Sequence, residues 1–238
     1  MARYVVTGAS SGIGREIALQ LAFGGHSVIA LGRDRHRLEE LALQNRRIET
    51  HALDVRDRDG LIAWTSELAK SEAIDGLINN AAIQHNIRFD DPRYGIDEIV
   101  AEVETNLLAP ILLSRLLLSG RSGQPFVIVN VGSALASYPK TTSAVYSATK
   151  AGLRMFSDAL AVQNHATPVR SVDVVLPLVD TAMTAGRGRG KIRATDAASA
   201  IVSALAPGKG RIHVGKTKLL RLLQLIAPPA AAAIIRKL

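Results

Sequence analysis

The sequence predicts a doubly wound, Rossmann-like α/β fold: a parallel seven-stranded sheet with helices on both faces, in a single domain. Strand-like apolar runs alternate with helix-like segments along most of the chain, which is typical of this class. Several runs are continuously apolar, as expected for strands covered on both faces. A glycine-rich turn follows the first run and opens a helix, as in dinucleotide-binding folds.

The predicted strands are short and rich in Val, Ile and Leu, and the predicted helices between them are amphipathic. The strands cover Arg3–Val6, Ser27–Leu31, Ile48–Leu53, Ile74–Ile78, Phe126–Val131, Val169–Leu176 and Ile212–Val214. The helices cover Gly14–Phe23, Asp34–Asn45, Arg58–Lys70, Ile96–Leu118, Val145–Asn164 and Ala194–Ala206. Ligands of such sheets bind beyond the carboxyl ends of the strands, so the residues that follow each strand are site candidates.

Composition excludes several kinds of site. The chain has no cysteine, which excludes disulfides, thiolate metal sites and a cysteine nucleophile. Its six histidines are widely separated in the sequence, so no metal site is predicted. The net charge of +8 favours acidic partners. No nucleic-acid partner is expected, because the basic residues are not interleaved with aromatic ones and no reading motif is present.

The N-terminal residues give an expectation about location. The chain enters an apolar strand at Tyr4 without a charged leader and a small-residue cleavage site. No uninterrupted apolar run is long enough to span a bilayer. We therefore expect a cytoplasmic protein.

The turn Thr7-Gly8-Ala9-Ser10-Ser11-Gly12-Ile13-Gly14 has the properties of a phosphate site. Glycines permit positive φ angles and close approach of a ligand to the main chain. A helix that begins there directs free N–H groups and a positive dipole end at an anion. An ordinary strand-to-helix turn is the alternative, but the position after the first strand favours a nucleotide. The candidate cofactor residues are Gly8, Ser10, Ser11, Gly12, Ile13 and Gly14.

The end of the second strand bears on the choice of cofactor. An acid there would bind the ribose 2′-hydroxyl and repel a 2′-phosphate. The sequence has Gly32 in that place and Arg33 next, and a guanidinium can bind a phosphate through paired hydrogen bonds. NADP(H) is therefore preferred, with NAD(H) as the alternative. Asp34 could be the ribose acid, but its position predicts the N-cap of the next helix.

A further group of polar residues follows the strands at the same edge of the sheet. Tyr146 and Lys150 are four residues apart at the start of a predicted helix, so they share one helix face. Ser133 comes just after a strand, and Asn106 lies late in a helix. The run Asn79-Asn80-Ala81-Ala82 ends another strand.

These pieces together resemble the short-chain dehydrogenase/reductase family. The matching residues are Thr7–Gly14, Asp54-Val55, Asn79–Ala82, Asn106, Ser133 and the Tyr146/Lys150 pair. They occur in the family's order and are spread over most of the fold.

The resemblance implies a role for each residue of the catalytic set. Tyr146 would exchange a proton with the substrate oxygen, and Lys150 would lower the pKa of that phenol and bind the nicotinamide ribose. Ser133 would orient the substrate oxygen, and Asn106 would hold a water molecule in a proton relay. The further cofactor contacts that the resemblance implies are Asp54, Val55, Asn80, Ala81, Val179 and Thr181.

The implied function is NADPH-dependent hydride transfer between nicotinamide and a carbonyl or secondary alcohol of a small molecule that the sequence does not identify. The alternative is a catalytically idle dinucleotide-binding sensor or scaffold, against which the complete Asn106/Ser133/Tyr146/Lys150 set argues. The family also implies a homodimer or homotetramer.

Two departures from the family pattern affect the site. Ala82 stands where the family has glycine. After the sixth strand the family reads Pro-Gly-x-Val-x-Thr, and this chain reads Leu176 to Thr181. Val179 and Thr181 match, whereas Pro177 replaces the glycine and removes an N–H donor.

The last part of the catalytic domain, residues 1–215, includes a short substrate loop at 182–193. Its run from Gly186 to Lys191 alternates glycine with basic residues, so we expect mobility without ligand. The charges would hold an anionic substrate or the cofactor pyrophosphate, or would simply be solvated. We expect an aliphatic pocket from Ala134, Leu135, Val145, Leu178 and Met183.

The C-terminal tail, residues 216–238, differs in composition from the rest. Basic residues, Lys218, Arg221, Arg236 and Lys237, flank an apolar run from Leu222 to Ile235 that is interrupted at Pro228-Pro229. We expect the tail to belong to the same domain or to an oligomer interface. The alternative is weak contact with an anionic membrane surface.

Overall fold

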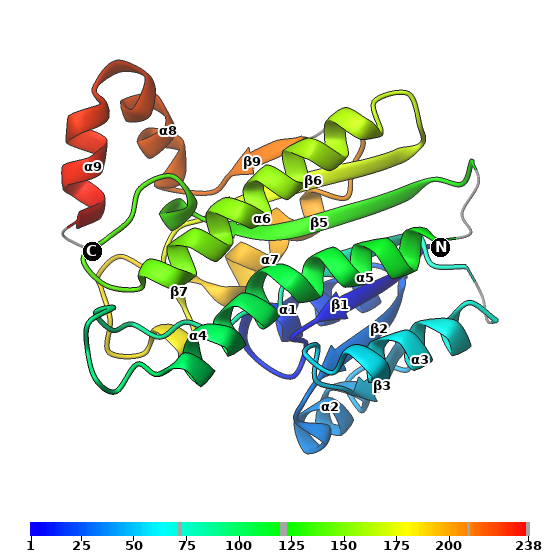
Figure 1. Cartoon of the computed structure of the whole chain (residues 1–238). Helices are drawn as coiled ribbons and strands as arrows, with labels where there is room; N and C mark the ends of the chain where they lie inside the picture. Colours follow the sequence, from blue (N-terminus) through cyan, green and yellow to red (C-terminus); the bar gives the residue numbers. More distant parts are fainter. Residues whose placement is uncertain (71–72, 120–122, 209, 237–238) are drawn as a thin grey trace.

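The computed structural model describes residues 1–70, 73–119, 123–208 and 210–236. Its centre is a sheet of seven parallel strands in the order β3-β2-β1-β4-β5-β6-β9 (Figure 1). The chain moves outward from β1 to β3 and then returns to β4 beside β1, so the winding direction reverses between β1 and β4. The strands are β1 (Arg3–Thr7), β2 (Ser27–Gly32), β3 (Ile48–Ala52), β4 (Gly76–Asn79), β5 (Phe126–Ser133), β6 (Val169–Leu176) and β9 (Arg211–His213). The predicted doubly wound sheet is confirmed.

Helices cover both faces of the sheet. Helices α1 and α7 pack against each other on one face, and α3, α5 and α6 lie on the other (Figure 1). The helices around the sheet are α1 (Gly12–Phe23), α2 (Arg35–Ala42), α3 (Arg58–Leu68), α4 (Ile96–Val103), α5 (Ala109–Leu118), α6 (Ala144–Gln163) and α7 (Ala194–Ser203).

The alternation of side chains along each strand divides the core into two layers. Val5 and Leu77 are fully buried in the layer that contains Leu113 of α5. Their neighbours in sequence point to the opposite face, where Val6 packs in the layer that contains Ile17 of α1. Burial of each aliphatic side chain contributes roughly 1.5–3 kcal/mol. The doubly covered sheet is thus a rigid support for the loops at its carboxyl edge.

The prediction of one continuous helix over Ile96–Leu118 is wrong, because the structure divides this segment into two helices. A π-helical turn, Glu104–Leu108, separates α4 from α5. Pro110 gives the physical reason, because proline has no N–H to donate to the carbonyl four residues earlier, that of Asn106. π-Turns often occur at functional sites.

Two short strands were not predicted. β7 (Val179–Asp180) and β8 (Ile192–Arg193) form a separate parallel pair at the carboxyl edge of β6. This pairing holds the two ends of the predicted substrate loop together.

The C-terminal tail forms a helical hairpin of α8 (Thr217–Ile226) and α9 (Pro228–Arg236) (Figure 1). The prolines that interrupt the apolar run begin α9. Proline is tolerated there because the N–H groups of the first helical turn have no acceptor within the helix. Leu220 and Ile235 are buried and pack near Leu135, which follows β5 in the same chain. Residues 237 and 238 of the predicted tail lie outside the described residues. No helix in the described ranges has both the length and the apolar character needed to cross a membrane.

Candidate active site

A cavity of about 330 Å³ runs along the carboxyl edge of the sheet. The glycine-rich turn lines one end, and β5, α6 and the segment after β7 line the other. It brings together every predicted cofactor and catalytic residue except Gly14 and Asn106. The predicted residues in its wall are Gly8, Ser10, Ser11, Gly12, Ile13, Arg33, Asp54, Val55, Asn80, Ala81, Ser133, Tyr146, Lys150, Val179 and Thr181.

The glycine-rich turn is shaped by its glycines. Gly8 and Gly12 have φ angles of 67° and 54°, in the left-handed region that favours glycine. Gly14 lies behind the turn, where an added Cβ would be 2.2 Å from the Gly8 carbonyl oxygen. Within the described residues, the N-cap Ser11 makes no side-chain capping hydrogen bond, so the first N–H groups of α1 stay available to a ligand. The turn therefore fits a pyrophosphate.

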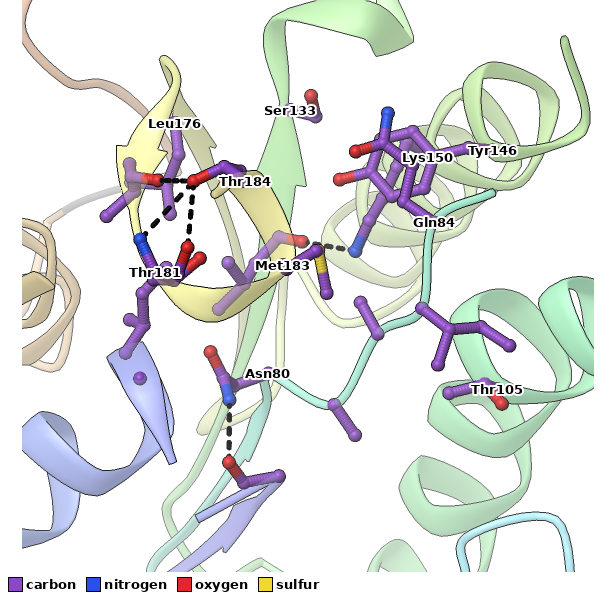
Figure 2. Close-up of a pocket in the computed structure, with 18 of the residues that line it drawn as sticks. Asn80, Gln84, Thr105, Ser133, Tyr146, Lys150, Leu176, Thr181, Met183 and Thr184 are labelled. Carbon is purple, nitrogen blue, oxygen red and sulfur yellow. Dashed lines mark hydrogen bonds between the residues drawn. The ribbon is translucent and has the colours of Figure 1, made fainter. Parts of the chain in front are cut away.

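Hydrogen bonds fix the floor of the cavity between β1 and β4. The Thr7 hydroxyl accepts hydrogen bonds from the main-chain N–H groups of Asn80 and Ala81, both at 3.0 Å. The Asn80 side chain, labelled in Figure 2, donates to the Thr7 carbonyl at 2.9 Å and to the Gly8 carbonyl at 3.5 Å. Asn80 therefore holds the start of the glycine-rich turn in place.

Arg33 lies at the adenosine end of the cavity and is largely exposed, with 63% of its side chain accessible. Its guanidinium is 3.9 Å from the Asp54 carboxylate, which is bound more closely by Arg56 at 2.7 Å. Asp34 caps α2 by accepting a hydrogen bond from the Arg37 N–H at 3.1 Å, and it does not line the cavity. The N-cap interpretation of Asp34 is confirmed. Arg33 lines this end of the cavity together with Asp54.

Ser133, Tyr146 and Lys150 meet at the other end (Figure 2). Ser133 is the last residue of β5, and its hydroxyl is close enough to Tyr146, in the first turn of α6, to lower the pKa of the phenol. The Lys150 ammonium lies one helical turn away, 5.7 Å from the centre of the Tyr146 ring. It donates to the Val131 carbonyl at 2.9 Å and is almost fully buried.

Burial has the largest effect on the two ionisable groups at this end. It raises the pKa of Tyr146 to about 12, although the neighbouring Ser133 hydroxyl acts in the opposite direction. It also lowers the pKa of Lys150 to about 8, and Asp173 opposes that shift. The lowering of the Tyr146 pKa by Lys150 that the family resemblance implies stays a prediction.

Asn106 is buried in the π-turn and lies outside the cavity wall. Its side-chain oxygen accepts from the Ile83 N–H at 2.8 Å, and its amide donates to the Ile83 carbonyl at 2.8 Å and to Thr149 at 3.4 Å. The side chain thus ties the segment after β4 to α6. Its role in holding a water molecule remains a prediction.

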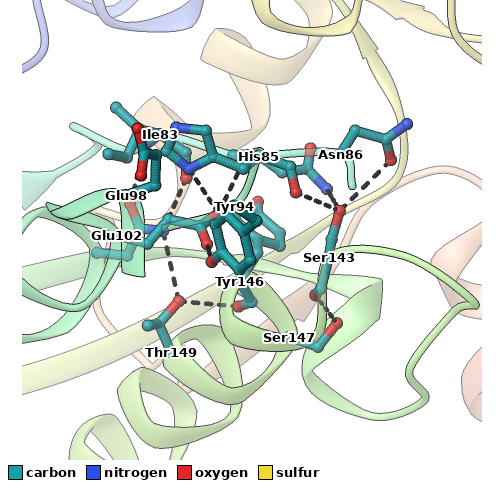
Figure 3. Close-up of polar contacts among 12 residues, drawn as sticks. Ile83, His85, Asn86, Tyr94, Glu98, Glu102, Ser143, Tyr146, Ser147 and Thr149 are labelled. Atoms are coloured by element: carbon teal, nitrogen blue, oxygen red, sulfur yellow. Dashed lines mark hydrogen bonds and ion pairs between the residues drawn. The ribbon is translucent and has the colours of Figure 1, made fainter. Parts of the chain in front are cut away.

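A buried acid that the sequence did not identify supports the same segment (Figure 3). Glu102 is fully buried, and it accepts hydrogen bonds from the His85 N–H at 2.9 Å and from the Tyr94 hydroxyl. Ser143, at a φ angle of 61°, accepts from the Gln84 side chain and donates to the His85 carbonyl, each at 3.1 Å. These contacts place Gln84 beside Tyr146.

The substrate end contains further residues that no motif indicated. Arg187 donates to the Gln84 side chain at 3.1 Å, and Lys140 and Ile235 also line the cavity. The prediction that Val145 belongs to the aliphatic wall is wrong, because Val145 does not line the cavity. It is one position from Tyr146, so its side chain points about 100° away from that of Tyr146 around the helix. The members of that wall that do line the cavity are Ala134, Leu135, Leu178 and Met183.

The segment between β7 and β8 follows a defined path. A single helical turn, Ala182–Thr184, is followed by Lys191, whose ammonium donates to the Thr184 carbonyl at 2.7 Å. The mobility expected for this segment stays a prediction. No group of three or more His, Asp or Glu side chains in the described ranges is arranged to hold a metal ion.

Comparison with known proteins agrees with this geometry. The family model described as "short chain dehydrogenase" matches residues 3–191. An uncharacterized oxidoreductase of Bacillus subtilis, DltE, is 38% identical over 75% of this chain and 72% of its own length. The NADP-dependent 3-hydroxy acid dehydrogenase YdfG of Salmonella typhi is 34% identical over 74% of this chain and 71% of its own.

Solved structures show the same architecture. A short-chain dehydrogenase from Streptomyces avermitilis is 26% identical in sequence and superposes with a TM-score of 0.84. The superposition includes 97% of this chain and 93% of the Streptomyces chain. The family match extends over most of the sheet and the whole cavity edge from the glycine-rich turn to Lys191. This chain belongs to the short-chain dehydrogenase family of NAD(P)-dependent oxidoreductases.

Proposed function

We propose that the protein is an NADPH-dependent oxidoreductase that transfers a hydride between nicotinamide and a carbonyl or secondary alcohol, with Tyr146 as general acid and base. The observation that carries this proposal is the meeting of Ser133, Tyr146 and Lys150 in the same cavity as the glycine-rich turn. A pure binding protein has no need of that arrangement.

The cavity wall fits a dinucleotide. The main chain at Gly8 and Gly12 and the free N-terminus of α1 would hold the pyrophosphate. Asp54 and Val55 would flank the adenine, and Val179 and Thr181 would contact the carboxamide. The bound cofactor supplies or accepts the hydride.

Arg33 supports the preference for NADPH. Among the residues that the structure describes, its exposed guanidinium makes only a distant ion pair with Asp54, so it is available to bind a 2′-phosphate. The acid nearest to the end of β2, Asp34, is used in capping α2. The relative YdfG is named as NADP-dependent.

The hydroxyl groups of Ser133 and Tyr146 would handle the substrate oxygen. With a pKa of about 12, the Tyr146 phenol holds at neutral pH the proton that it would donate to a carbonyl oxygen during reduction, and a lower pKa in the loaded site would make that donation more efficient. Ser133 would orient that oxygen by hydrogen bonding. With a pKa of about 8, Lys150 is mostly charged at neutral pH and would bind the nicotinamide ribose.

Substitution of Tyr146 tests this assignment. Tyr146→Phe removes the proton donor and keeps the ring, so we expect turnover to fall by about 10³-fold, with the NADPH dissociation constant unchanged. Carbonyl reduction is followed by NADPH absorbance, and binding by NADPH fluorescence. Tyr4→Phe is the matched control, because Tyr4 lies in β1 and packs against His26, away from the cavity.

Two outcomes would contradict the proposal. Turnover that survives in Tyr146→Phe removes the phenol from the mechanism. Tight NADPH binding by the wild type, without reduction of any compound in a broad panel of carbonyls, favours the sensor or scaffold instead.

A further inference from the structure

Two cationic side chains line the substrate end of the cavity. Lys140 lies in the segment between β5 and α6, and Arg187 lies in the segment between β7 and β8. Both are partly buried. Arg187 is close enough to Tyr146 for their charges to interact, which locates the guanidinium near the proposed proton donor.

The hydrogen-bond partners of these two cations are neutral. The Lys140 ammonium donates to the Asn86 side-chain oxygen at 2.5 Å, and Arg187 donates to the Gln84 side-chain oxygen at 3.1 Å. No carboxylate in the described parts of the chain forms an ion pair with either one. Nearby Lys191 differs, because it pairs with Asp180 at 3.3 Å. Amide oxygens orient the two cations without neutralising them.

This arrangement is unfavourable without an anion. Burial lowers the pKa of Arg187, and burial together with the charge of Arg187 lowers the pKa of Lys140. A partly buried cation beside a like charge is stabilised by an opposite charge placed between them. A guanidinium also keeps further N–H donors in the planar geometry that matches a carboxylate. The chain itself supplies no such acid among its described residues, so a ligand is expected to do so.

The position of the pair distinguishes substrate from cofactor. The site proposed for the cofactor phosphates is at the glycine-rich turn after β1 and at Arg33 after β2, whereas Ser133 ends β5, on the other side of β4. We propose that the substrate carries an anionic group, a carboxylate or sulfonate, near its reacting carbonyl, and that Lys140 and Arg187 bind this group. This inference rests on the proposed function for the carbonyl and defines which carbonyl compounds the site selects.

Matched acids and esters test the proposal in turnover. Acetoacetate is compared with methyl acetoacetate, and levulinate with methyl levulinate, so that the charge changes at two distances from the ketone. The wild type should reduce at least one acid with a higher kcat/KM than its ester. Arg187→Gln and Lys140→Gln should each lower that acid preference by at least about tenfold. Arg189→Gln is the matched control, since Arg189 is exposed in the same segment and outside the cavity wall.

Binding without turnover gives an independent measurement. Isothermal titration of NADPH-saturated protein with malonate, and with its neutral analogue malonamide, should show binding of malonate only. Arg187→Gln and Lys140→Gln should weaken malonate binding by at least about tenfold, whereas Arg189→Gln and Tyr146→Phe should keep it. A failure of the acid–base assignment would thus leave this result intact.

Three results would overturn the anion site. The first is malonate binding that is absent in the wild type or equal in all variants. The second is equal use of acids and esters by the wild type. The third is a loss of NADPH affinity, rather than of acid preference, in Arg187→Gln, which would assign Arg187 to the cofactor pyrophosphate.

Discussion

The two ends of the cavity are built in different ways. At the cofactor end the main chain forms the wall, and the glycines of the turn after β1 give it its shape. At the substrate end the wall consists of side chains from four separated segments, such as Gln84, Lys140, Arg187 and Ile235. A wall of main chain tolerates few residue types, whereas a wall of side chains admits any residue of suitable size and charge. The first end therefore serves a constant ligand, and the second can be altered without disturbing the fold.

The largest effect is expected at the cofactor end. In Gly14→Ala the new Cβ would lie 2.2 Å from the Gly8 carbonyl oxygen and 2.6 Å from the Asn80 side chain, so the turn must move. We expect NADPH affinity to fall by at least about 100-fold and stability to fall by about 1–3 kcal/mol. NADPH fluorescence and thermal unfolding measure the two effects. Gly210→Ala is the control, because none of the described residues beyond its chain neighbours lies within 4 Å of its added Cβ. Normal NADPH binding by Gly14→Ala would show that the turn is less constrained than its geometry indicates.

The same difference explains which parts of the site could be predicted from the sequence. Gly8 and Gly12 have positive φ angles that favour glycine, and Gly14 leaves no room for a Cβ, so their spacing between a strand and a helix is recognisable. Lys140 and Ile235 have no such local constraint, and only the tertiary structure brings them to the cavity.

The fold shows a similar limit. The central strands β1, β2, β4 and β5 were predictable because their apolar runs follow from burial on both faces, whereas the edge strands β3 and β9 are only partly buried. The π-turn at Glu104–Leu108 was missed because the apolar pattern continues through it, although Pro110 was a signal. The direction in which burial shifts the pKa of Tyr146 could not be predicted, because burial of a polar group is not visible in the sequence.

An intermediate effect is expected for Arg33, the side chain on which selectivity at the cofactor end depends. Arg33→Asp would remove the proposed phosphate contact and place an acid near the ribose, so NADPH affinity should fall by about 10- to 100-fold and NADH affinity should rise. The ion pair lost with Asp54 is long and exposed, so stability should hardly change. Titration of both cofactors by fluorescence, with Arg35→Asp as control, measures the shift. An unchanged ratio of the two affinities would remove Arg33 from the phosphate site.

The smallest effect is expected at the C-terminal hairpin, which extends the substrate end. Ile235 of α9 is 2% exposed and contributes to the cavity wall, whereas its neighbour Ile234 is 48% exposed. Ile235→Ala should open that wall and raise the KM of the carbonyl substrate by about tenfold or less, the loss expected for a few methylene groups. The NADPH dissociation constant should stay the same, and Ile234→Ala should change neither value. If Ile235→Ala weakened NADPH binding instead, the hairpin would act on the cofactor end, and the two ends of the cavity would not be independent.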